Sequence, residues 1–316
     1  MGSRVTGLSN YYLFQRSLSL RNIEMSRAAE QLSSEKRINR PSDDPTGSVQ
    51  VLAMRQSIAK LEQYDRNLNA ANQALIQTES TLSSVNEEVI LKARDIAIKA
   101  NAPQNKSPES RAALAAEVQQ LQQHLLTLSN TQINGKYLFA GYKTDTTPFT
   151  LDAAQPNADP VETYAGDTNV QSIQISDSST LVIQSRGDQL FQGDGTANTV
   201  NLFQSLANLE AAIRSGDYST TSATGVPQML EDLNKGSQQI INEITSIGAK
   251  TNRLDTAKIQ LAGQRTTLSS FISDIEDADM AEVATNFSRA NTALQATLQS
   301  AGAILNLPSL INFIGR

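Results

Sequence analysis

Few side chains in this sequence have the types and spacing that support chemistry. His124 is the single histidine and there is no cysteine, so a metal site or a histidine-activated nucleophile lacks its partners. The acidic pairs Glu87-Glu88 and Glu231-Asp232 are predicted to be solvated helix faces, and Gly193-Asp194-Gly195 lacks the alternating carboxylates of a calcium loop. We therefore predict that the protein is not an enzyme and has no catalytic residue, cofactor or metal site.

The composition of the chain argues against nucleic acid and membranes as partners. The chain has 316 residues, of which 39% are hydrophobic and 18% charged, and its net charge is -6. An acidic chain without clustered lysine and arginine is not expected to bind nucleic acid. It contains no run of about 20 apolar residues, so no membrane partner is expected. Arg16 closes the short apolar stretch near the N-terminus, so we also expect no cleaved signal peptide.

Two long segments place an apolar side chain at every seventh position, which predicts helices with a continuous apolar stripe. Each segment has roughly 50 residues, or about 75 Å of helix. We predict a mainly α fold, a long antiparallel helical rod resembling a coiled-coil bundle, with a small inserted β domain and amphipathic terminal helices. The predicted seam consists of Leu61, Leu68, Leu75, Leu82 and Val89 with Leu233, Ile240, Ile247, Leu254, Leu261 and Leu268.

Turn and strand signals divide the chain further. Residues 137–139, 161–164, 170–175 and 180–184 are predicted strands, and a helix of roughly 25 residues beginning at Ser107-Pro108 packs along half of the first long helix. The predicted domains are residues 1–47 (terminal helix and loop), 48–136 (first part of the rod), 137–198 (β insert), 199–276 (second part of the rod) and 277–316 (C-terminal assembly helix).

Both ends of the chain are predicted to be amphipathic helices used in assembly. Leu20 and Ile23 lie off the main apolar stripe of the first helix, which suggests more than one neighbour. The alternative is that the two ends pair with each other within one subunit, and the sequence does not decide whether they are ordered in the monomer. The predicted assembly surface is Tyr11, Phe14, Leu18, Met25, Leu32, Phe287, Leu294, Leu298 and Leu305.

The loop after the first helix contains opposite charges close together. Pro41 must end the first helix, and Asp44-Pro45 is a strong start for the next one. The neighbouring cations and the carboxylates of Asp43 and Asp44 favour either an ordered network or a solvated connector, and both alternatives stay open.

Three segments together resemble the bacterial flagellin family. They are residues 32–47, the pair of long helices, and the sequence Ile275-Glu276-Asp277-Ala278-Asp279-Met280-Ala281-Glu282 with Asn286-Phe287-Ser288-Arg289-Ala290. Within that family, residues 137–141 and 144–149 are similar to the members that stand at the junction of hook and filament.

The resemblance implies a structural role in the flagellum. It implies a ring of copies of this chain between hook-associated protein 1 and the flagellin filament, outside the cell. It further implies passage through the flagellar type III export apparatus with an export chaperone, and terminal helices that fold against neighbours during assembly.

Two alternatives remain at this point. A flagellin filament subunit would polymerise alone into long filaments, whereas a junction subunit would need its neighbours. A secreted coiled-coil binding module or adhesin would use the β insert to bind a ligand, and its function would survive removal of the termini.

Overall fold

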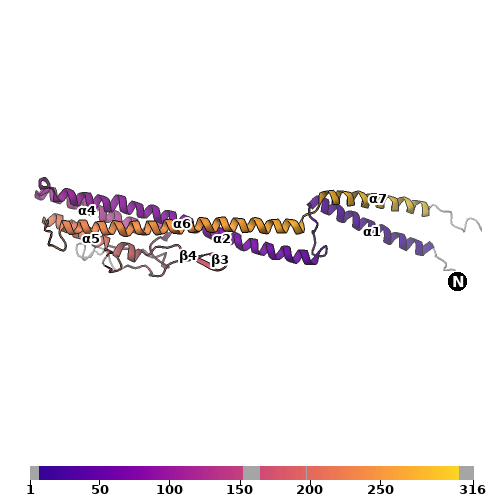
Figure 1. Cartoon of the computed structure of the whole chain (residues 1–316), viewed down its shortest axis with the longest axis horizontal. Coiled ribbons are helices and arrows are strands. Elements are labelled where there is room, and N and C mark those ends of the chain that lie inside the picture. The colour runs from indigo at the N-terminus through magenta and orange to yellow at the C-terminus, as the bar shows by residue number, and fades with distance from the viewer. Residues whose placement is uncertain (1–6, 152–163, 197, 306–316) are drawn as a thin grey trace, which may run out of the picture. The chain divides into compact units, whose positions relative to one another are not determined.

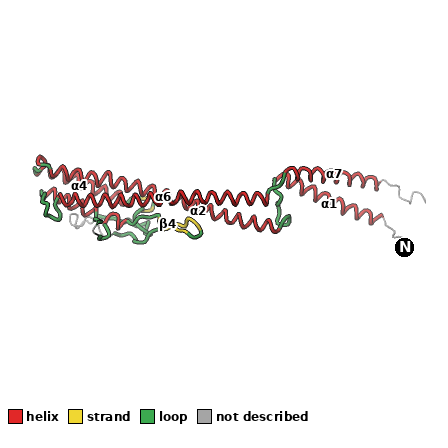
Figure 2. The backbone as a smooth tube through the Cα atoms, viewed as in Figure 1, coloured by secondary structure: helices red, strands yellow, loops and turns green. Residues whose placement is uncertain are grey.

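The computed structural model describes residues 7–151, 164–196 and 198–305, and helices dominate it (Figures 1 and 2). The predicted mainly α class with a small β region is confirmed. The α-helices are α1 (Gly7–Ser34), α2 (Pro45–Ser84), α3 (Leu91–Asn101), α4 (Pro108–Ser129), α5 (Leu202–Ser215), α6 (Val226–Glu276) and α7 (Met280–Leu305). The strands are β1 (Gln132–Ile133), β2 (Lys136–Tyr137), β3 (Ser172–Ser176) and β4 (Ser179–Val182).

The chain divides into two compact units. Residues 1–60 and 263–316 form what we call the terminal unit, and residues 61–262 form the central unit. The helices α2 and α6 each contribute residues to both units.

Local capping explains where the helices of the central unit begin and end. Ser107 accepts a hydrogen bond from the backbone N–H of Ser110 at the start of α4, and Asn201 does the same for Gln204 at the start of α5. The helix α5 ends at Ser215 and is capped by Gly216, whose φ of 77° is the left-handed conformation that glycine adopts readily. A π-helical turn, η1 (Val85–Ile90), continues α2 directly into α3.

The long helices run antiparallel within the central unit. Three side-chain hydrogen bonds link them: Lys258 donates to Asn69 at 2.9 Å, Ser237 to Asn86 at 2.7 Å, and Arg94 to Asn234 at 3.3 Å. Residue numbers thus decrease along α6 while they increase along α2, η1 and α3, which makes the two antiparallel. The helix α4 packs against α3, η1 and α5. A single apolar core joins these helices to the loops around them.

An aromatic cluster joins Phe139, Phe149 and Phe191 to Phe203 of α5. Phe149 lies 5.4 Å from Phe191 and 5.5 Å from Phe203 of α5, measured between ring centroids, and Phe139 meets Phe191 edge to face at 5.1 Å. The Tyr164 hydroxyl donates to the carbonyl of Phe139 at 2.6 Å. Burial raises the pKa of Tyr164, so its phenol remains a neutral donor. Phe139, Phe149 and Phe191 therefore belong to the core of the central unit, and Tyr164 packs against it.

The strands are shorter than the predicted ones that they overlap. β1 and β2 pair across Asn134-Gly135, whose φ values of 52° and 77° suit a tight hairpin turn, and β3 pairs antiparallel with β4. The predicted strand at 137–139 is wrong beyond Tyr137, because the Phe139 side chain is drawn into the aromatic cluster. Tyr164 is not in a strand, and the rest of the strand predicted at 161–164 lies outside the described residues.

Candidate functional site: the terminal helix pair and its junction

The helices α1 and α7 pack along each other in the terminal unit (Figure 1). The least exposed stripe of α1 includes Ala28, and that of α7 includes Ala290 and Ala301, so small residues allow the two helices a close approach. The ends of the chain therefore pair within one molecule, as the alternative above anticipated. Half-buried members of the predicted assembly surface lie on these stripes: Phe14, Leu18, Met25, Leu32, Phe287 and Leu294. Their role between copies stays a prediction.

The opposite face of α1 exposes large apolar side chains. Leu13 is 62% exposed and Ile23 60%, and Tyr12 and Leu20 are at least half exposed. At about 100° per residue these four fall on the side of α1 away from the stripe that includes Phe14 and Ala28. On α7, the predicted residue Leu298 is likewise half exposed. Tyr11 and Leu305 are helical, but their side chains lie outside the described part of the chain.

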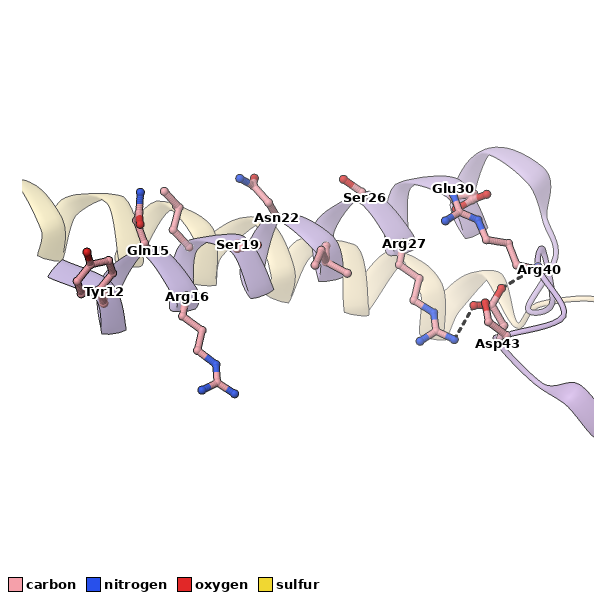
Figure 3. A pocket seen from close by; sticks show the side chains of 13 residues that line it. Tyr12, Gln15, Arg16, Ser19, Asn22, Ser26, Arg27, Glu30, Arg40 and Asp43 are labelled. Atoms are coloured by element: carbon pink, nitrogen blue, oxygen red, sulfur yellow. Dashed lines mark hydrogen bonds and ion pairs between the residues drawn. The ribbon is translucent and has the colours of Figure 1, made fainter. Parts of the chain in front are cut away.

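A polar groove of about 960 Å³ follows α1 toward the loop that precedes α2 (Figure 3). Arg27 reaches the carboxylate of Asp43 at 3.0 Å, and Arg40 reaches that of Glu30 at 2.9 Å. These two ion pairs attach the last turns of α1 to the loop.

The junction between this helix pair and the long helices is built on Glu276, the last residue of α6. Its side chain is only about 8% exposed, and it binds Arg55 of α2 at 2.6 Å and Lys36 of the loop at 2.8 Å. A carboxylate at a helix C-terminus opposes the helix dipole, so it depends on these two cations. Both cations are about half exposed, which weakens the electrostatic contribution through solvent screening.

Backbone hydrogen bonds reinforce the same junction. The carbonyl of Glu276 accepts from the N–H of Arg37 at 2.7 Å, and the carbonyl of Glu35 accepts from the N–H of Ala278 at 3.0 Å. The Arg37 guanidinium donates to the carbonyl of Ile275 at 2.7 Å. These hydrogen bonds connect the segment after α1 to the segment before α7, although Arg37 and Ile275 are 238 positions apart in the sequence.

Two aspartates give the loop its conformation. Burial alone would raise the pKa of Asp43, but backbone donors at Arg40 and Asn39 and the charges of Arg27 and Arg40 lower it below 3.8 overall. The hydrogen bond from the N–H of Gly47 lowers the pKa of Asp44, which caps α2 just before Pro45. The charges of this loop therefore form an ordered network.

Sequence reasoning missed the central residue of this junction. Glu276 stands out in the sequence only as one residue of the segment 275–282 that resembles flagellins, and nothing near Arg55 in the sequence signals a partner 221 positions away. The acidic residues that precede α7 do carry a signal, because Asp279 accepts from the N–H of Ala281 as a helix cap.

The predicted seam residues fall mainly in the central unit. Leu61 is half-buried at its edge and Leu268 is half-buried in the terminal unit. The others are buried in the common core: Leu68, Leu75, Leu82, Val89, Leu233, Ile240, Ile247, Leu254 and Leu261. Their role as the seam between the long helices of the rod stays a prediction.

The residues first considered for chemistry lie in the central unit. His124 of α4 meets Glu88 at 3.0 Å on a partly exposed surface. Asp194 accepts hydrogen bonds from Thr196 and Thr199, which lower its pKa to about 2. Within the described residues, no group of three or more histidine, aspartate or glutamate side chains could hold a metal ion. None of the helices described is long and apolar enough to cross a membrane.

Two family models match the chain. The model of the bacterial flagellin N-terminal helical region matches residues 8–144, and that of the C-terminal helical region matches residues 230–314. These matches include α1, α7 and the whole junction.

Characterised relatives match nearly the full length. Flagellar hook-associated protein 3 of Escherichia coli K12 is 28% identical over 310 residues, covering 92% of this chain and 93% of the relative. The protein of the same name from Salmonella typhimurium LT2 is 27% identical over 88% of this chain and 89% of its own. Flagellin of Bacillus subtilis 168 is 27% identical over 89% of each chain.

Solved structures share the fold. A flagellar hook-associated protein from Vibrio parahaemolyticus aligns with a TM-score of 0.65 at 20% identity, over 74% of this chain and 100% of the other. Flagellar hook-associated protein 3 from Legionella pneumophila aligns with a TM-score of 0.60 at 18% identity, over 71% of this chain and 98% of the other.

Proposed function

This chain belongs to the bacterial flagellin family, and from that premise we propose that it is a non-enzymatic structural subunit joining the flagellar hook to the filament. The observation that carries the proposal is the match to hook-associated protein 3, which extends over 92% of this chain and 93% of the relative. At that coverage the match concerns the subunit as a whole.

The exposed face of α1 supports an assembly role. Burying a large apolar side chain is worth about 1.5 to 3 kcal/mol, so covering the exposed fractions of four such residues gains roughly 3 to 7 kcal/mol. Association costs about 4 to 15 kcal/mol in lost freedom. One such contact is therefore too weak alone, which favours a closed ring in which each copy meets several neighbours.

The proposed partners follow from this position. Copies of the chain form the ring, hook-associated protein 1 lies on the hook side, and flagellin lies on the filament side. An export chaperone covers the apolar terminal surface before the chain passes through the flagellar type III apparatus to the outside of the cell.

Deletion of the gene tests the proposal. The mutant should keep its hooks, lack filaments and release monomeric flagellin into the medium, and the unaltered gene should restore motility. Normal filaments in the deletion strain would contradict the junction role.

A flagellin subunit is the second candidate, because Bacillus subtilis flagellin matches 89% of this chain. It predicts that the purified chain polymerises alone into long filaments. A junction subunit should form no long filaments in the same buffer, and electron microscopy of the purified full chain distinguishes the two.

A further inference from the structure

A second groove lies in the terminal unit where α2 begins. It has a volume of about 400 Å³, and its walls are largely apolar. Ser48 lines it, and the hydroxyl oxygen of Ser48 has no hydrogen-bond partner among the described residues. The apolar lining residues are Ile38, Pro41, Pro45, Val49, Val51 and Leu52.

The rim of this groove is exposed to solvent. Val49 is 69% exposed and Leu52 58%, and the two lie one helical turn apart on the same face of α2. The floor is already packed, since Val51 and Ile38 are both buried. An apolar segment entering the groove would therefore remove both rim side chains from water without disturbing the residues beneath them.

We propose that residues 307–314 of a second copy of this chain occupy the groove. The proposal rests on the proposed function, because it concerns contacts between assembled copies. The segment lies outside the described residues, and its sequence suits an apolar groove: it contains no charged residue. Its large apolar side chains are Leu307, Leu310, Ile311, Phe313 and Ile314.

The length of α7 favours a second copy over the same chain. The helix leaves the junction at Met280 and ends at Leu305, about 38 Å away at 1.5 Å per residue. The 11 residues that follow span at most about 36 to 40 Å when fully extended. To return to its own groove, the segment would have to be stretched almost completely, which leaves no residues free to settle in it.

Such a contact joins two different surfaces. The contact between the C-terminal segment of one copy and the groove of the next is heterologous. Repeated heterologous contacts close into a ring when the rotation between copies permits. The contact would place the end of one terminal helix pair beside the Glu276 junction of the next copy, because Glu276 and Arg55 also line this groove.

Site-directed cross-linking tests the proposal, and the absence of native cysteine makes it specific. Full-length chains carrying Val49→Cys with one tag and Phe313→Cys with another are mixed at high concentration and treated with a short bis-maleimide. Ile259→Cys, at an apolar residue of α6 that is 75% exposed, replaces Val49→Cys as the matched control. If Val49→Cys does not fold by circular dichroism, Leu52→Cys replaces it.

We expect cross-links between the two tags at least about tenfold above the control, which corresponds to a preference of roughly 1.4 kcal/mol. A yield equal to that of the control overturns the proposal. In the double variant Val49→Cys/Phe313→Cys, cross-links confined to single chains also overturn it, because the segment then occupies its own groove. The deletion phenotype is a separate readout, so normal filaments in that strain would refute the junction role without altering the cross-linking result.

Discussion

The central and terminal units bury different kinds of side chain. The central unit buries Phe139, Phe149, Phe191 and Phe203 almost completely, together with leucines of the long helices. Over its described residues, the terminal unit buries alanines, the β-branched Ile38, Val51 and Val283 and the charged Glu276, but no aromatic ring, while it leaves Leu13 and Ile23 in water. Because large apolar side chains supply most of the driving force for folding, we predict that the central unit folds by itself and that the terminal unit depends on neighbours.

The largest effect should follow damage to the aromatic cluster. Phe191→Ala should lower the free energy of unfolding of the central unit by about 3 to 5 kcal/mol, because it leaves a cavity among three other rings. Denaturant unfolding followed by circular dichroism measures this loss. Phe271→Ala, at a half-exposed phenylalanine of the terminal unit, is the matched control and should cost much less. Equal losses would remove the contrast between the units.

A smaller effect is expected at the junction. Glu276→Gln should destabilise it by about 1 to 3 kcal/mol, less than the 3 to 5 kcal/mol of a fully buried pair, because Arg55 and Lys36 are half exposed. The amides of Arg37 and Ala278 should then exchange their hydrogens faster.

Glu282→Gln, at an exposed acid of the first turn of α7, is the control and should leave those amides unchanged. Unaltered exchange in Glu276→Gln would show that the backbone hydrogen bonds alone hold the junction.

Acid should loosen the terminal unit further. The pKa of Asp43 is lowered in the folded chain, so its stabilising contribution is complete above about 3.8 and is lost as the pH falls through the lower folded value. Hydrogen exchange of the amides of Asn39 and Arg40, which donate to Asp43, should therefore accelerate below pH 3.8. Asp43→Asn should exchange rapidly already at pH 6, and a flat pH profile in the unaltered chain would contradict the role of Asp43.

The smallest effect on the isolated chain is expected on the outer face of α1. Leu20→Asp with Ile23→Asp should change the free energy of unfolding by no more than about 0.5 kcal/mol, because both residues are exposed. The same variant should abolish filament growth if neighbours cover this face.

Ser19→Asp with Ser26→Asp adds the same charge at exposed polar positions of α1 and serves as the control. Normal motility in the Leu20→Asp/Ile23→Asp variant would show that the outer face of α1 is not an assembly surface.

The sequence was informative where periodicity governs structure. The heptads predicted α2 and α6, and Asp44-Pro45 predicted the start of α2, because capping is a local property. The junction could not be predicted, since the partners of Glu276 are remote in sequence. The strand predicted at 137–139 was wrong beyond Tyr137, because tertiary packing of Phe139 overrode its local preference.

Hydrogen exchange measured by mass spectrometry on the isolated full chain tests the central claim most directly. We predict slow exchange in residues 68–97 and 229–254 and much faster exchange in residues 12–34 and 280–302. The exchange of the latter two segments should slow when the chain is in assembled flagella. Equal protection of both units in the isolated chain would contradict the central claim, because the terminal unit would then be stable without neighbours.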